Sequence, residues 1–226
     1  MKKRNQATLV AAIALLVGFA LWTALVQLVD VAPIGPESSS VGFATLNGCV
    51  HDATGVHMGL YTVTDWLGLV PIATVLGFAI FGLAQWIRRK SLLKVDRSLF
   101  CLGGFYIVVL AVYILFELVV VNRRPVLING YLEASYPSST TMLALCVMPT
   151  AAMQIFPRIK SAPLRWSITG AILLFTLFMV LGRLLSGVHW LTDIIGGGLC
   201  SAGLVMLYAF FTNPAKGAWS GREAVK

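Results

Sequence analysis

The sequence is poor in charged residues. Asp, Glu, Lys and Arg make up 12% of the 226 residues, about half of the roughly 25% that is usual in soluble domains. Hydrophobic residues make up 58% of the chain. This composition excludes an ordinary soluble globular domain and indicates an integral membrane protein.

The four cysteines follow no recognisable pattern. They are widely spaced, with no C-x-x-C pair and no metal-site spacing. Three of them lie in apolar runs, where we expect core residues, and Cys49 lies in a loop without an obvious partner. His51 and His57 are six residues apart, which is a poor spacing for a helical metal pair, and no Cys/His cluster supports them. The sequence therefore predicts no disulfide framework, no metal site and no cofactor.

A cleavage signal is also missing. The basic residues at 2–4 precede a long apolar run, as they do in a signal sequence, but no small-residue site of the A-x-A kind follows. The run over 8–30 is long enough to cross a bilayer, so we expect a retained helix. No internal repeat or low-complexity tract is evident in the chain.

The sequence does contain six long apolar segments. Most of them match the roughly 20 residues that a bilayer core requires, and they must be helical because lipid offers backbone groups no other partner. The fourth is short and carries Pro149, so we expect it to be kinked or to extend into its flanks. The sequence thus predicts an all-α fold, a six-helix transmembrane bundle in a single integral-membrane domain over 1–226. The expected spans are 8–30, 66–87, 99–121, 141–156, 166–187 and 190–212.

Basic residues indicate the orientation. In a six-span arrangement, 14 of the 17 Lys and Arg residues fall on one side, and the positive-inside rule makes that side and both termini cytoplasmic. We therefore interpret the formal charge of +8 as a topology signal in a cell (inner or plasma) membrane, and not as a nucleic-acid surface. The longest connection, 31–65, is expected outside, partly flat at the interface. Arg123, Arg124 and Arg183 also fall outside, where anion binding would explain them.

The segment from Gly182 to Asp193 places Arg, His and Asp between two apolar runs, where each is costly without a partner or a function. Gly187 breaks the helical pattern, so Arg183 should end one helix and His189 should begin the next. The Asp lies four residues after the His, so its carboxylate can hold one imidazole nitrogen and leave the other free to react. With the Arg as a bidentate fork for an oxyanion, this arrangement suits phosphoryl transfer through a phosphohistidine. The alternative interpretation is a polar clamp that only packs two helices.

A second polar segment precedes the fourth span. Pro137 is followed by Ser138, Ser139 and Thr140, a pattern typical of a helix N-cap with free backbone N–H groups. Such a helix start is a ready anion site. The segment would also serve as a plain cap of the fourth helix, but it falls on the same membrane face as Arg183.

These segments resemble the type-2 phosphatidic acid phosphatase family, the integral-membrane branch of the superfamily that includes vanadium haloperoxidases. The third sequence block of that family is Ser-Arg-x5-His-x3-Asp. Arg183, His189 and Asp193 match it in residue type and spacing, with Gly182 in place of the Ser. Six helices with a site that faces outward also fit that family.

The first two blocks of the family, Lys-x6-Arg-Pro and Pro-Ser-Gly-His, are matched only in part. Arg124-Pro125 matches the end of the first block and Pro137-Ser138 matches the start of the second. The Lys of the first block falls on Glu117, which reverses the charge. The His of the second block falls on Thr140, and Ser139 replaces the Gly.

The resemblance implies a role for each matching residue. His189 would attack phosphorus, Asp193 would orient it, and Arg183 would hold phosphate oxygens. The other expected substrate-binding residues are Arg124, Ser138, Ser139 and Thr140.

The motif His is the family's candidate acid for the leaving oxygen, and a threonine cannot take that role near neutral pH. A better leaving group such as a diphosphate, or another acid such as Glu133 or His57, would compensate for its loss.

The sequence therefore predicts a membrane lipid phosphatase that hydrolyses a lipid phosphate or diphosphate at the outer membrane face. Its expected partners are the lipid phosphate substrate and the bilayer, without nucleic acid. Glu117 and Arg123 are expected to modulate the site. Glu117 would act either as a counter-ion of Arg123 or Arg183, or by favouring a less anionic ligand. Because two motif residues are changed, a degenerate non-hydrolytic lipid-phosphate binder or transporter, or a phosphotransferase, remains the alternative.

Overall fold

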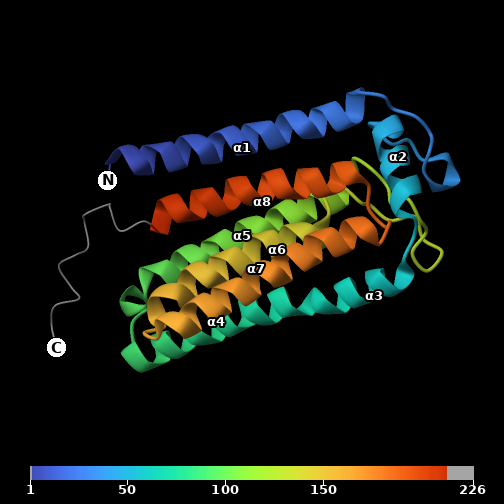
Figure 1. Ribbon diagram of the computed structural model, residues 1–226. Helices are drawn as coiled ribbons and strands as arrows, with labels where there is room; N and C mark the ends of the chain where they lie inside the picture. Colours follow the sequence, from blue (N-terminus) through green and yellow to red (C-terminus); the bar gives the residue numbers. More distant parts are fainter. Residues whose placement is uncertain (1, 213–226) are drawn as a thin grey trace.

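The computed structural model describes residues 2–212, and within this range the chain is all-helical without a β-strand (Figure 1). This confirms the predicted fold class. Short 3-10 turns and loops join the α-helices. In chain order the α-helices are α1 (Lys2–Leu28), α2 (Ala44–Thr54), α3 (Met58–Leu67), α4 (Leu69–Arg89), α5 (Arg97–Leu118), α6 (Ser139–Ile155), α7 (Ala162–Leu185) and α8 (Leu191–Thr212).

Six helical segments of the described chain are long and apolar enough to cross a membrane, as the sequence predicts. The second of them begins earlier than expected. It runs over Met58–Arg89, because α3 continues into α4 through Gly68, whose backbone is itself helical (φ −59°, ψ −20°). The connection over 31–65 is therefore largely helical, since it contains α2 and most of α3.

The bundle is built around α6. Half of its most apolar window is buried inside the protein, compared with 11% for α1, which lies along α8 at the edge of the bundle (Figure 1). A continuous apolar core joins α5, α6 and α8. Its fully or largely buried members include Leu102, Phe105, Met142, Cys146, Leu204 and Tyr208.

Small residues let α1 and α8 approach each other closely. A Cβ atom at Gly203 of α8 would lie 2.8 Å from the side chain of Leu16 on α1. Because lipid removes the hydrophobic drive for helix association, close backbone packing of this kind is what holds transmembrane helices together. Large apolar side chains on the outer surface, such as Ile80 and Leu174, are suited to contact lipid.

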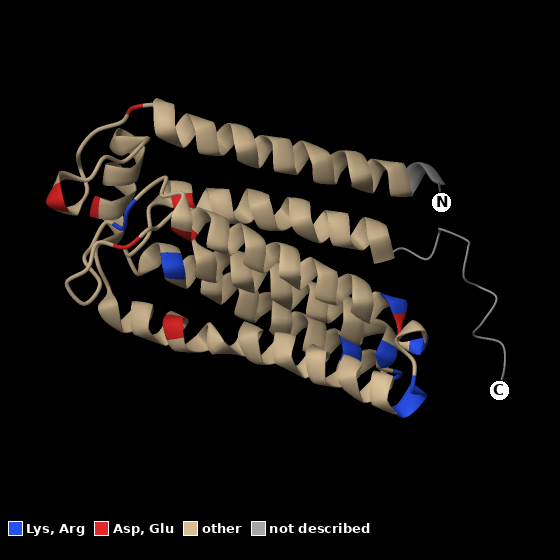
Figure 2. Cartoon of the chain, turned by 180° about the vertical axis from the view of Figure 1, so that it is seen from behind, with Lys and Arg blue, Asp and Glu red and all other residues tan. Residues whose placement is uncertain are grey.

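The two ends of the bundle differ in charge (Figure 2). Lys and Arg residues gather at the end where α4 meets α5 and α6 meets α7, on the side where α1 begins. There Asp96 accepts hydrogen bonds from Gln85 at 2.8 Å and Arg89 at 2.9 Å, and it lies 3.6 Å from Arg158. Burial raises the pKa of Asp96, but these hydrogen bonds and charges outweigh it and hold the pKa below its ordinary value. The positive-inside rule predicts that this end is cytoplasmic.

Candidate active site

The polar residues singled out in the sequence converge at the opposite end of the bundle. There the loop over 119–138, the start of α6 and the turn from α7 to α8 lie together. Gly187 makes this turn possible, because its φ of +68° is in the left-handed region. A Cβ atom at this position would also collide with the backbone carbonyl of Gly55. The predicted helix break is therefore confirmed.

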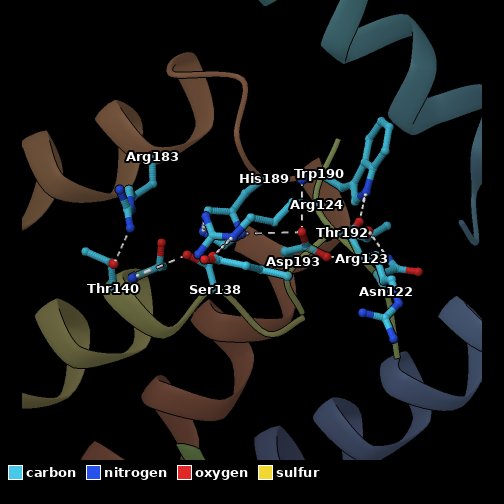
Figure 3. Close-up of polar contacts among 12 residues, drawn as sticks. Asn122, Arg123, Arg124, Ser138, Thr140, Arg183, His189, Trp190, Thr192 and Asp193 are labelled. Atoms are coloured by element: carbon cyan, nitrogen blue, oxygen red, sulfur yellow. Dashed lines mark hydrogen bonds and ion pairs between the residues drawn. The ribbon is translucent and has the colours of Figure 1, made fainter. Parts of the chain in front are cut away.

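His189 lies just before α8 and is 3% exposed. Its Nδ1 is 3.5 Å from Oδ2 of Asp193, which is fully buried in the first turn of α8. The same carboxylate accepts hydrogen bonds from the Trp190 backbone N–H at 2.9 Å and the Asn122 amide at 3.4 Å. These bonds fix the carboxylate behind the imidazole, which leaves Nε2 as the nitrogen that faces the site (Figure 3).

Arg124 lies beside that nitrogen. Its Nη1 is 3.4 Å from Nε2 of His189, and its Nε pairs with the carboxylate of Glu133 at 3.0 Å. Burial lowers the pKa of His189 well below its ordinary value of 6.5, and the charges of Arg124 and Arg183 lower it further. A hydrogen bond with the Ser135 backbone opposes this shift without reversing it. The imidazole is therefore neutral near pH 7, and it keeps the lone pair that a nucleophile needs.

Arg183 closes the other side of the site and is 2% exposed. Its Nη2 donates to the Thr140 hydroxyl at 2.7 Å (Figure 3) and lies 3.3 Å from the Asp65 carboxylate. Its Nη1 donates to Thr64 at 3.4 Å, and the guanidinium carbon lies 4.9 Å from the centre of the Tyr61 ring. These contacts hold the guanidinium in one orientation, next to the position that carries His in the second motif block.

The start of α6 completes the site. Ser138 is the N-cap residue, as predicted, and its side chain accepts a hydrogen bond from the Thr141 backbone N–H at 3.5 Å. Its own N–H donates to the backbone carbonyl of Asp193 at 3.2 Å, which ties α6 to α8. The first N–H groups of a helix have no intrahelical partner and carry partial positive charge. Two arginines and a helix start thus surround a neutral imidazole, an arrangement that can bind a phosphate in front of a nucleophile.

The family model described as the PAP2 superfamily matches residues 103–216, half of the chain, and this range includes every motif residue. The chain belongs to the PAP2 superfamily. The resemblance drawn from the three sequence blocks is therefore confirmed, and the protein is a multi-pass membrane member of a lipid phosphatase family.

A solved structure shares this PAP2 fold. It is the crystal structure of the first transmembrane PAP2 type phosphatidylglycerolphosphate phosphatase from Bacillus subtilis. The alignment covers 88% of this chain and 94% of that chain, with a TM-score of 0.52 and 19% sequence identity. A search of curated proteins finds no match.

Of the two roles expected for Glu117 in this PAP2 protein, that of a counter-ion of Arg123 or Arg183 is wrong. Glu117 does not pair with either arginine proposed for it, because Arg183 pairs with Asp65 and the Arg123 guanidinium donates to the Leu132 carbonyl at 2.9 Å. Arg123 thus contacts its own loop, 119–138, through its guanidinium. Its own carbonyl accepts the indole N–H of Trp190 at 2.7 Å, on the far side of the site from Arg183 (Figure 3).

The two substitute acids suggested by the sequence are engaged elsewhere. Glu133 forms the ion pair with Arg124, and His57 hydrogen-bonds through Nε2 to the Thr54 carbonyl at 2.9 Å in an exposed position. Asp65 was not predicted from the sequence. It could have been found, because a carboxylate at the edge of an apolar segment is by default a candidate functional residue.

Two hollows meet at the site. A small cavity is lined by His189, Glu117 and Ser135, among others. A much larger apolar groove of about 940 Å³ runs between α4, α5 and α6, from Asp65 and Thr140 at the site to Trp86 near the other end. The two hollows share the lining residues Tyr113, Ser139 and Met142.

Proposed function

We propose that this PAP2 protein hydrolyses a lipid phosphate or diphosphate at the outer membrane face, through a phosphohistidine on His189. The observation that carries the proposal is the neutral, buried imidazole with Nε2 3.4 Å from Arg124. Behind it lies the carboxylate of Asp193. The imidazole faces a cavity that continues into an apolar groove within the membrane-spanning helices.

Phosphate binding would use groups that are already oriented. The guanidinium groups of Arg124 and Arg183 and the first N–H groups of α6 would donate to the phosphate oxygens. Both guanidinium groups are held by carboxylates whose side chains are about half exposed, 44% for Glu133 and 57% for Asp65. Carboxylates in contact with solvent are readily solvated, so a phosphate can displace them at a modest cost.

The reaction would then proceed in two displacements. Nε2 of His189 attacks phosphorus, the bond to the leaving oxygen breaks, and the carboxylate of Asp193 stabilises the positive charge that the ring acquires. Water attacks the phosphohistidine in the second step and releases inorganic phosphate with the free imidazole. The arginines and helix N–H groups neutralise the charge that develops on the phosphoryl oxygens in both steps.

The groove supports a lipid as the substrate. Its lining over Leu69–Trp86 of α4 is apolar apart from the end at the site, and the segment rises roughly 25 Å at 1.5 Å per residue. This length is close to the roughly 30 Å of a bilayer core. A hydrocarbon chain in the groove would place its phosphate at the residues that both hollows share.

The test is His189→Ala in the purified full-length protein, with phosphate release from lipid phosphates as the readout. We expect the variant to lose release and to lose an acid-labile phosphoryl label that the wild type acquires from labelled substrate. The matched control is His57→Ala, an exposed histidine outside the cavity, which should keep both. Equal release by wild type and His189→Ala would refute the mechanism.

A second function has one observation in its favour. Glu117 and Thr140 replace the Lys and His of the family motif, which favours a protein that binds or moves a lipid phosphate without cleaving it. In that case the wild-type protein would bind a lipid phosphate and release no inorganic phosphate over a long incubation.

A further inference from the structure

The proposed hydrolysis, on which this inference rests, needs a general acid, and none of the residues described so far takes that role. The oxygen that leaves phosphorus needs a proton when the leaving group is a lipid alcohol. Thr140 stands where the motif has His, and its hydroxyl accepts a hydrogen bond from Arg183 at 2.7 Å. Glu133 is held by Arg124 at 3.0 Å.

The carboxyl group of Glu117 lies close to the expected position of that oxygen. Along α5 the residues Tyr106, Leu110 and Tyr113 line the groove at helical spacing, and Glu117 follows one turn later on the same face. Glu117 lines the small cavity together with His189. The leaving oxygen joins phosphorus, at the imidazole, to the hydrocarbon chain in the groove. It must therefore lie near the junction of the two hollows, within reach of this turn of α5.

Among the described residues 2–212, Glu117 forms no ion pair with a cation, whereas Asp65 and Glu133 each hold an arginine of the site. Arg183 is fixed by its own contacts with Asp65 and Thr140. A carboxyl group without a cationic partner can carry a proton to the substrate and take one back.

We propose that Glu117 is the general acid and base of this PAP2 protein, in place of the missing motif histidine. In the first step Nε2 of His189 bonds to phosphorus, the phosphorus–oxygen bond of the lipid breaks, and the carboxyl proton of Glu117 moves to the departing oxygen. In the second step the Glu117 carboxylate accepts a proton from the attacking water. The phosphorus–nitrogen bond then breaks, so that His189 and protonated Glu117 are both restored.

The leaving group provides the test, because only a poor leaving group needs an acid. Rates are measured with the purified full-length protein on two phosphate monoesters that carry the same alkyl chain, an alkyl phosphate and a nitrophenyl phosphate. Glu117→Gln should lower kcat/KM for the alkyl phosphate by about 10²–10⁴-fold, and for the nitrophenyl ester by less than about tenfold. The retained nitrophenyl rate also shows that the variant is folded. Adding Thr140→His to Glu117→Gln should restore turnover of the alkyl phosphate.

Glu37 is the matched control, since it is an exposed carboxyl group in the 3-10 turn over Pro36–Ser38, outside both hollows. Glu37→Gln should keep both rates. A loss confined to the alkyl phosphate in Glu37→Gln, or equal losses on both substrates in Glu117→Gln, would overturn the proposal. If His189→Ala is inactive while Glu117→Gln keeps full activity on the alkyl phosphate, only the role of Glu117 falls. If the wild type shows no turnover, or turnover that does not depend on His189, the proposed function is overturned as well.

Discussion

The ion pair between Arg183 and Asp65 should compete with the substrate, and its strength can be worked out from the structure. The two side chains are 3.3 Å apart, with the guanidinium 2% exposed and the carboxylate 57% exposed. Coulomb's law gives about 5 kcal/mol at this distance for an effective dielectric constant of 20, and about 1.3 kcal/mol for bulk water. Because the carboxylate is half in solvent, the lower part of this range applies, about 1–2 kcal/mol.

The variant Asp65→Asn removes this competitor, while the hydrogen bonds of Arg183 to Thr140 and Thr64 keep the guanidinium in place. A gain of about 1–2 kcal/mol in phosphate binding corresponds to a KM that is about 5–30-fold lower, with kcat changed much less. The assay is steady-state phosphate release from a lipid phosphate in detergent micelles. Asp52→Asn is the control, since Asp52 is an exposed carboxylate on α2 outside both hollows. An unchanged or higher KM in Asp65→Asn would show that the carboxylate does not compete for Arg183.

The turn between α7 and α8 leads to further expected outcomes. Because burial and the neighbouring arginines lower the pKa of His189, the imidazole stays unprotonated as the pH falls, so the acidic limb of kcat/KM against pH should lie well below 6.5. The unfolded chain takes up this proton first, so the same group should cost stability as the pH falls below 6.5, which thermal unfolding at several pH values would reveal. Gly187→Ala should destabilise the protein by at least about 1–2 kcal/mol, because its φ is +68° and the added Cβ meets the Gly55 carbonyl. A melting temperature equal to that of the wild type would contradict this.

The fold was predictable because lipid leaves the backbone few choices. A long apolar segment in a bilayer must be a helix, and six such segments with a one-sided distribution of basic residues define most of the bundle. The predicted start of the second span was wrong. Thr64 and Asp65 are polar, so the apolar pattern starts only after them, yet both lie in helix α3. Both side chains contact Arg183, and the pattern of apolar residues cannot predict such a contact.

The motif residues of the site could be named from spacing alone, but their partners could not. His189 and Asp193 are four residues apart, and their pairing is a matter of local geometry. Arg183 and Asp65 are 118 residues apart, and Arg124 lies 65 residues from His189. Such contacts depend on how whole helices pack. From the sequence, either of two arginines could have paired with Glu117, whereas packing supplied both arginines with other partners.

The carboxylates that hold the two arginines would also act at the end of the proposed reaction. Inorganic phosphate is small and highly charged, and a site that carried two bare guanidinium groups would retain it. Here Glu133 would pair with Arg124 again, and Asp65 with Arg183, as the phosphate departs. In the proposed hydrolysis this pairing would favour release of the product, so turnover would continue while free phosphate accumulates.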